Sequence, residues 1–147
     1  MPKIHRSQRV PYTAAQMFDL VNDVEAYPEF LHGVRGARIE EQGEGYMIAT
    51  IDIGIAGIHK SFTTQNTFER PHRLDIELVS GPFRHLDGLW EFEDVGENEC
   101  EVSVTLTFEV APSPLSVVFS MVFEELVRAQ VAAFVHRAEA VYGPPKQ

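Results

Sequence analysis

The chain has 147 residues, of which 44% are apolar and 23% charged, so we expect one globular domain over residues 1–147 and exclude a disordered chain. The formal charge of −10 argues against general attraction to nucleic acid or anionic lipid. We therefore expect no DNA partner and at most transient membrane contact. The sequence shows no membrane-spanning apolar run and no signal peptide, and it has a single cysteine, which together predict a cytoplasmic protein.

The N-terminal part predicts a strand followed by two short helices. Residues 3–10 are expected to form a mostly polar strand. Thr13 and Gln16 have the spacing of a capping box, which predicts that a helix begins there. The stretch AYPEFLHG predicts a second, shorter helix, with Pro28 in its first turn and Gly33 as its C-terminal cap.

The middle of the chain predicts a run of antiparallel strands, because apolar and polar residues alternate and turn residues separate the segments. A tight turn around Ala56 and Gly57 joins two of these strands. The expected strands are residues 34–42, 45–55, 58–69, 72–80, 86–95 and 99–109. The last of them has one apolar and one polar face, which is typical of a sheet that buries one side.

The C-terminal part predicts one long amphipathic helix. Ser113 is the expected N-cap with Pro114 at the first helical position, and Gly143 ends the helix. Such a helix has about 29 residues and spans about 40 Å. Because twisted sheets curl, the helix is expected to cover the concave face of the sheet. The fold class is therefore α+β, with a long helix gripped by a curled antiparallel sheet.

Several polar residues are expected on the inner side of this fold. In strand 58–69, Thr64 and Asn66 share a side with phenylalanines, whereas the other side is wholly polar and must face water. On the long helix, Gln130 and Arg137 fall within the apolar arc. Two interpretations remain open: these groups satisfy one another in a sealed core, with Arg137 at a solvated helix end, or they line an amphiphilic ligand pocket.

The stretch SGPFRHLDGLWEFE bears on the same choice, because it places Gly88 between Leu86 and Trp90, the only tryptophan. Glycine packs nothing and weakens a strand. Gly88 therefore indicates either that backbone passes close by or that the space beside it is open to a ligand.

The sequence shows no residue pattern that predicts catalysis or metal binding. The six histidines lack metal-ligand spacing, and Cys100 has no neighbouring base in the sequence. No positioned acid–base pair stands out. We expect a protein that is not an enzyme, with no metal and no required cofactor.

Basic residues gather in two short stretches despite the acidic balance. Lys3, Arg6 and Arg9 lie near the N-terminus, and Arg35 and Arg38 follow in the second strand. They are either solvated edge-strand charges that discourage edge pairing or a local patch that binds a partner.

The chain resembles the START-like coenzyme Q-binding family over about residues 1–143. The segments that carry the resemblance are VPY, LVNDVEAYPEFL, AGIHKSFTT, GPF, GLWEF and the helix around VFEEL. Within the family it is most similar to the bacterial ribosome association toxins, formerly labelled oligoketide cyclase/lipid transport proteins. It departs from the pattern at His32 and Val34, where relatives often have proline and cysteine.

The resemblance implies a helix-grip fold of the START-like or Bet v 1-like type, with a hydrophobic tunnel between sheet and helix. We expect a non-enzymatic binding protein for a hydrophobic small molecule, an isoprenoid quinone such as ubiquinone, which supports respiration. The alternative is a toxin-like regulator that binds the large ribosomal subunit and blocks subunit association. The residues expected to line the cavity are Phe30, Phe62, Thr64, Asn66, Phe83, Leu86, Gly88, Trp90, Phe123, Leu126, Gln130 and Phe134.

Overall fold

The structure, a computed structural model, describes residues 3–144 and has the α+β helix-grip architecture that the sequence predicts. One antiparallel sheet of seven strands has the order β1-β7-β6-β5-β4-β3-β2. The elements in chain order are β1 (Lys3–Val10), α1 (Ala14–Asn22), the 3-10 helix η1 (Val24–Glu29), β2 (Val34–Gly43), β3 (Tyr46–Ile55), β4 (Ile58–Glu69), β5 (Arg73–Ser80), β6 (Phe83–Gly96), β7 (Glu99–Val110), α2 (Ser116–Arg128) and α3 (Gln130–Tyr142).

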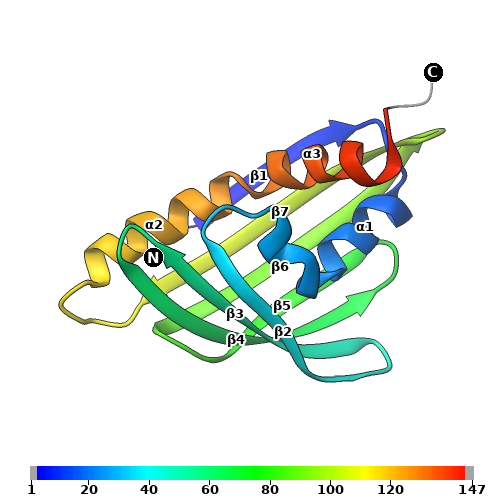
Figure 1. The fold of residues 1–147 in the computed structure, drawn as a ribbon. Coiled ribbons are helices and arrows are strands. Elements are labelled where there is room, and N and C mark those ends of the chain that lie inside the picture. The colour runs from blue at the N-terminus through cyan, green and yellow to red at the C-terminus, as the bar shows by residue number, and fades with distance from the viewer. Residues whose placement is uncertain (1–2, 145–147) are drawn as a thin grey trace.

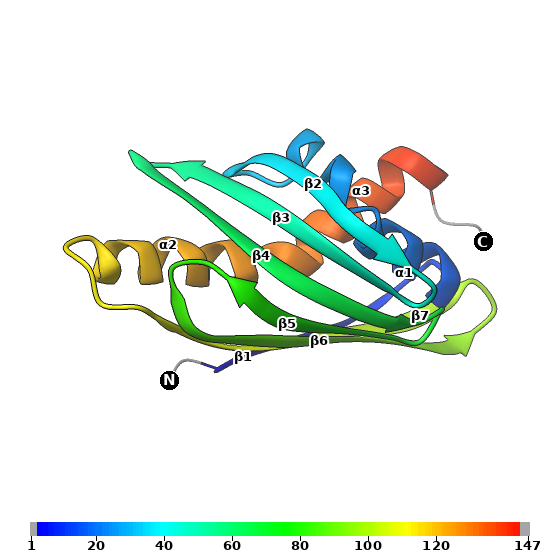
Figure 2. The same cartoon turned by 90° about the horizontal axis from the view of Figure 1, so that it is seen from below.

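The helices lie on one side of the curled sheet. Figure 1 shows α2 and α3 following one another along the sheet, with α1 beside α3. The view from below shows the strands curving beneath these helices, with β2 and η1 on one flank (Figure 2). The predicted arrangement, a sheet that grips a C-terminal helix, is therefore confirmed.

The N-terminal helix begins as predicted. The Thr13 hydroxyl accepts the Gln16 N–H at 3.1 Å, and the Gln16 side chain accepts the Thr13 N–H at 2.9 Å, which completes the capping box. The second predicted helix is a 3-10 helix that ends at Glu29. Gly33 is therefore not its cap; it adopts a φ of +90° in the loop before β2.

The C-terminal helix differs from the prediction in two respects. Its first residue is Ser116 rather than Pro114, and its N-cap is Leu115 rather than Ser113. The Ser113 carbonyl accepts the Ser116 N–H at 3.1 Å in a turn that precedes the helix. It is also interrupted at Ala129, whose φ of −85° and ψ of −8° separate α2 from α3. The long C-terminal helix therefore consists of two consecutive segments that meet at Ala129, and both lie over the sheet as predicted.

Two clusters of buried side chains make up the core. One lies beneath α1, η1 and α3 and includes Phe18, Trp90 and Phe134. The other lies beneath α2 and includes Phe83 and Phe123, whose ring centroids are 4.9 Å apart. The space between the two clusters is not completely filled, and this gap is the candidate site.

Candidate functional site

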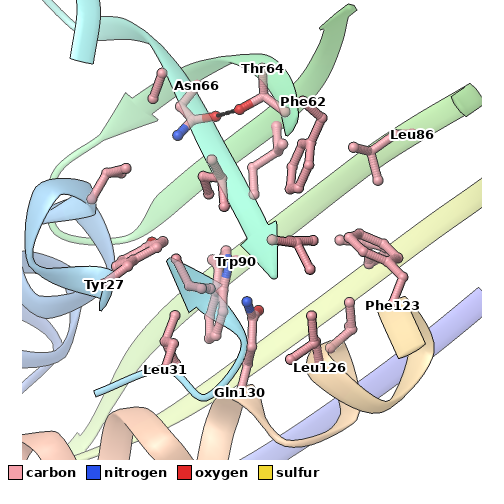
Figure 3. Close-up of a pocket in the computed structure, with 18 residues that line it drawn as sticks. Tyr27, Leu31, Phe62, Thr64, Asn66, Leu86, Trp90, Phe123, Leu126 and Gln130 are labelled. Carbon is pink, nitrogen blue, oxygen red and sulfur yellow. Dashed lines mark hydrogen bonds between the residues drawn. The ribbon is translucent and has the colours of Figure 1, made fainter. Parts of the chain in front are cut away.

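A cavity lies between the concave face of the sheet and the helices, bordered by both core clusters. About 80 Å³ of it is open to the centres of water-sized molecules, which is enough for several waters or a compact organic group. Figure 3 shows its walls. The lining residues are Val24, Tyr27, Leu31, Val34, Ala49, Ile51, Ile53, Phe62, Thr64, Asn66, Ile76, Leu86, Trp90, Leu106, Phe123, Leu126, Val127 and Gln130.

Strand β4 supplies the polar part of the sheet wall. Thr64 and Asn66 are both buried, which confirms that they point inward. The Thr64 hydroxyl donates a hydrogen bond of 2.9 Å to the Asn66 side-chain oxygen (Figure 3). Within residues 3–144, no group accepts from the Asn66 amide nitrogen. This nitrogen is therefore a donor available to a bound molecule or water.

Gln130 supplies the polar group of the opposite wall. It is the first residue of α3, directly after the interruption at Ala129. Its side chain extends from the helix toward the sheet, between Trp90 and Leu126 (Figure 3). The amide makes no hydrogen bond with the described part of the chain, and neither does the Trp90 indole N–H. Polar groups on facing walls of an apolar cavity are the usual means by which a site orients a ligand.

The cavity carries no ionisable group suited to acid–base catalysis in the part of the chain that is described. None of its lining residues is Asp, Glu, His, Lys or Arg. Tyr27 donates its hydroxyl hydrogen to the Val21 carbonyl. Burial, with a smaller contribution from Asp23, raises the pKa of Tyr27 above its usual value. Such a phenol neither gives up its proton near neutral pH nor offers it freely to a ligand.

The structure places the sequence-predicted site residues in two groups. Eight of the twelve line the cavity: Phe62, Thr64, Asn66, Leu86, Trp90, Phe123, Leu126 and Gln130. The other four do not line it: Phe30, Phe83, Gly88 and Phe134. Phe83 and Phe134 stand behind the wall, where Phe83 packs on Phe123 and Phe134 packs edge-on against Trp90. Whether any of the twelve contacts a ligand remains a prediction.

Gly88 requires a correction, because the space beside it is not open. Gly88 is paired with Ile76 on one side and Leu106 on the other. A Cβ atom on Gly88 would lie 3.3 Å from Leu106 Cδ1 and 3.6 Å from Ile76 Cβ. The two neighbouring side chains close over the glycine and form the cavity wall in its place.

Arg137 lies outside the cavity. The sequence had allowed either a solvated position or a pocket position for this residue. Its guanidinium donates to the Glu29 carboxylate at 3.2 Å and lies 4.9 Å from the centroid of the Phe30 ring. The side chain is 22% exposed. It fastens α3 to η1 at the surface.

Sequence reasoning missed the part of the wall that comes from η1 and the loop after it. Val24, Tyr27 and Leu31 belong to this part. They fall on a 3-10 helix and a loop, where no regular period tells which side faces inward. The inner residues of β3 are different, since Ala49, Ile51 and Ile53 alternate along a predicted strand and could have been included.

The fold and cavity define an α+β helix-grip protein with a partly enclosed, uncharged and largely apolar site. The family model described as polyketide cyclase / dehydrase and lipid transport matches residues 10–135. The chain belongs to this START-like family. The family description includes enzymes as well as transport proteins, so membership alone does not settle catalysis.

Named relatives divide between two functions. The ribosome association toxin RatA of Escherichia coli K12 is 43% identical over 97% of this chain and 90% of its own length. The mitochondrial coenzyme Q-binding protein COQ10 homolog B of Xenopus laevis is 23% identical over 93% of this chain and 58% of its own length. A START superfamily protein from Mycobacterium smegmatis has the same fold, with a TM-score of 0.79 at 19% identity over 95% of this chain and 98% of its own.

The described residues contain neither a candidate membrane span nor a candidate metal cluster. No helix within residues 3–144 has both the length and the apolar character needed to cross a membrane. In the same part of the chain, no three or more His, Cys, Asp or Glu side chains gather as metal ligands would.

Proposed function

We propose that this protein is a ribosome association factor that binds the large ribosomal subunit and blocks subunit association. The observation that carries the proposal is 43% identity to RatA over nearly the whole chain. The quinone-dependent respiratory role, which the sequence features favoured, has weaker support, because the coenzyme Q-binding relative is only 23% identical. A ribosomal partner is consistent with the expected cytoplasmic location.

The charges of the described residues indicate which parts of the protein surface could contact ribosomal RNA. Most arginines are paired with carboxylates, including Arg9 with Glu99 at 3.5 Å. Within residues 3–144, the cations without a carboxylate partner are Lys3, Arg6, Arg35 and Lys60. Lys3 and Arg6 belong to β1 at one edge of the sheet; the other two lie near the opposite edge. Unpaired cations are the groups that can neutralise phosphates of ribosomal RNA.

Sedimentation with purified subunits tests the proposal. Wild-type protein should co-sediment with the large subunit and lower the fraction of joined ribosomes. Arg6→Glu on the edge strand β1 and Arg35→Glu on the opposite edge strand β2 make the same charge change, so each is the control for the other. The edge that contacts RNA is identified by the variant that loses co-sedimentation. If wild-type protein stays at the top of the gradient, the ribosomal function is wrong.

The cavity supports a second function, the binding of a hydrophobic small molecule. Its walls are largely apolar, and they carry the amide nitrogen of Asn66 and the amide group of Gln130 on facing sides. An isoprenoid quinone fits this description, because its carbonyl oxygens accept hydrogen bonds. Native mass spectrometry and lipid extraction of the purified protein would identify the bound molecule. A protein that carries no lipid and binds none on titration would contradict this function.

The uncharged cavity also supports a non-enzymatic role. A cyclase or dehydrase needs a group that transfers protons near neutral pH. The described lining contains only Tyr27 as a titratable side chain, and burial raises its pKa. Assays with polyketide-like substrates should therefore show no turnover, and measurable turnover would overturn this part of the proposal.

A further inference from the structure

Four large apolar side chains are exposed together at the beginning of α2, and we call them the α2 patch. They are Leu115, Val117, Val118 and Met121, with exposed fractions between 44% and 73%. Half of the large apolar residues that are exposed within residues 3–144 lie in this one stretch, whereas the others are scattered over β5, β6 and α3. Isolated exposed apolar residues are ordinary, but a contiguous group of them marks a binding surface.

The core does not require the patch. Phe119, Phe123 and Val127 are the buried residues of α2, and they follow one another every four positions along its inner face. Val117 and Met121 each lie two positions from Phe119, about 160° around the helix axis, and therefore on the opposite, outer face. Because they are four positions apart, their side chains are neighbours on that face. Figures 1 and 2 show the beginning of α2 at one end of the molecule, far from α1.

An open depression beside the patch carries negative charge. It has a volume of about 360 Å³, lies between the end of β7 and α2, and includes Val117, Met121, Glu109 and Glu124 in its lining. No lysine or arginine lines it in the described part of the chain. The arginine partners of Glu109 and Glu124 lie 3.5 Å and 3.4 Å away, which is long for a hydrogen bond between charged groups. Glu125 on the same helix has no cation partner within residues 3–144.

These carboxylates limit what can cover the apolar side chains. RNA or an anionic membrane would bring further negative charge to this surface. A second copy of the chain would bring the same carboxylates on a molecule with a net charge of −10. A polypeptide segment with apolar side chains flanked by lysine or arginine is complementary in both respects, because its apolar side chains cover the patch and its cations face the carboxylates.

We propose that the α2 patch binds a basic, partly apolar polypeptide segment that belongs to a protein of the large ribosomal subunit. This inference rests on the ribosomal function proposed above and adds the class of partner and the surface that it contacts. A protein that is itself bound to RNA carries an excess of lysine and arginine, which supplies the required charge. The unpaired cations described above lie on β1, β2 and β4 rather than on α2, so contacts with RNA and with protein would occupy different surfaces.

Two matched pairs of variants test the patch by co-sedimentation with purified large subunits. Val117→Glu places a charge in the patch, and Val141→Glu, at an exposed valine of α3, is its control. Glu125→Lys reverses a charge beside the patch, and Glu139→Lys, at an exposed glutamate of α3, is its control. Val117→Glu and Glu125→Lys should weaken binding by about tenfold or more, whereas the controls should stay within about twofold of wild type. All five proteins should melt at similar temperatures, because each substituted side chain is exposed.

The outcomes separate this inference from the function on which it rests. If wild-type protein and Val117→Glu bind the large subunit equally well, the ribosomal function stands and the α2 patch is not the contact surface. If wild-type protein does not bind the large subunit, both the function and the inference are wrong.

Photo-crosslinking identifies the molecule that covers the patch. The photoreactive residue benzoylphenylalanine is placed at position 121 in place of Met121, and the protein is irradiated together with purified large subunits. We expect a product that ribonuclease leaves intact and whose cross-linked peptide, identified by mass spectrometry, carries lysine or arginine beside apolar residues. A product that ribonuclease degrades, or one that joins two copies of this chain, would overturn the inference.

Flotation with vesicles tests the remaining occupant, a lipid surface. Wild-type protein should stay unbound to phosphatidylcholine vesicles and to phosphatidylglycerol vesicles. If wild-type protein floats with either kind of vesicle and Val117→Glu does not, the patch binds lipid and the inference of a protein partner is wrong.

Discussion

Leu126 packs against the backbone of Gly33, its Cδ2 atom lying 3.0 Å from the position that a Cβ atom on Gly33 would occupy. The contact joins α2 to the loop before β2. Leu126 also lines both the cavity and a surface groove between α2 and the loop before β2. Because Gly33 has no side chain, α2 can approach the loop before β2 closely. This contact positions Leu126 between the cavity and the surface groove.

The substitution Gly33→Ala should destabilise the protein for two reasons. The φ of +90° disfavours an L-residue, and the new methyl group would press on Leu126. We expect the free energy of unfolding, measured with urea, to fall by about 1–3 kcal/mol. Gly57→Ala is the control, since Gly57 also has a positive φ but no atom within 4 Å of the added Cβ. If both variants lose the same stability, the Leu126 contact contributes nothing.

The substitution Gly88→Leu should also destabilise the protein, because Ile76 and Leu106 already fill the space beside this glycine. Overpacking of this kind costs about 1–3 kcal/mol, and the displaced side chains would move into the cavity. We expect a lower melting temperature and reduced binding of hydrophobic probes. Gly96→Leu on the same strand is the control, since a Cβ there meets only Glu99, at 3.9 Å. An unchanged melting temperature for Gly88→Leu would show that this part of the wall yields easily.

Gly88 also shows what the sequence could and could not predict. Alternation along β4 and β6 assigned Thr64, Asn66, Leu86 and Trp90 to the inner face, because each strand residue alternates sides regardless of its neighbours. Whether a glycine on that face leaves a void depends on the side chains of the strands paired beside it. Which strands pair with one another is a tertiary property. The alternation of residues within one strand therefore does not reveal which side chains lie beside a glycine.

The interruption of the C-terminal helix was unpredictable for a related reason. The residues around Ala129 include no proline or glycine, the usual causes of a break in sequence. The capping box at Thr13 could be predicted because its hydrogen bonds join residues only three positions apart. Local signals were not always sufficient, since neither Ser113 nor Gly33 caps the helix that its local sequence suggested.

The Cys100 thiol should be unreactive in the folded protein. Burial, with smaller contributions from Asp94 and Glu99, raises its pKa to about 12. We expect native protein at pH 8 to resist thiol reagents and urea-unfolded protein to react at once. Rapid labelling of native protein would contradict the buried position.

The same shift gives a pH dependence of stability. A thiol in the unfolded chain has a pKa of about 8.5, whereas the folded thiol keeps its proton until about pH 12. Between these values the unfolded state loses a proton that the folded state retains, so the free energy of unfolding should fall as the pH rises. Cys100→Ala should reduce this alkaline loss, and an identical slope in wild type and variant would contradict the shift.

Gln130→Leu should separate stability from ligand binding. Gln130 is half-buried and its amide borders the cavity, so an apolar side chain of similar length extends the apolar wall without leaving a buried polar group behind. We expect the free energy of unfolding to stay unchanged or to rise by up to about 1 kcal/mol. The affinity for a dimethoxy-methyl-benzoquinone, used as the probe, should fall by about tenfold, the value of one hydrogen bond of about 1.4 kcal/mol. Trp90 fluorescence measures the binding and urea unfolding the stability. A variant that loses stability would show that the amide supports the fold, and one that keeps its affinity would remove Gln130 from the ligand site.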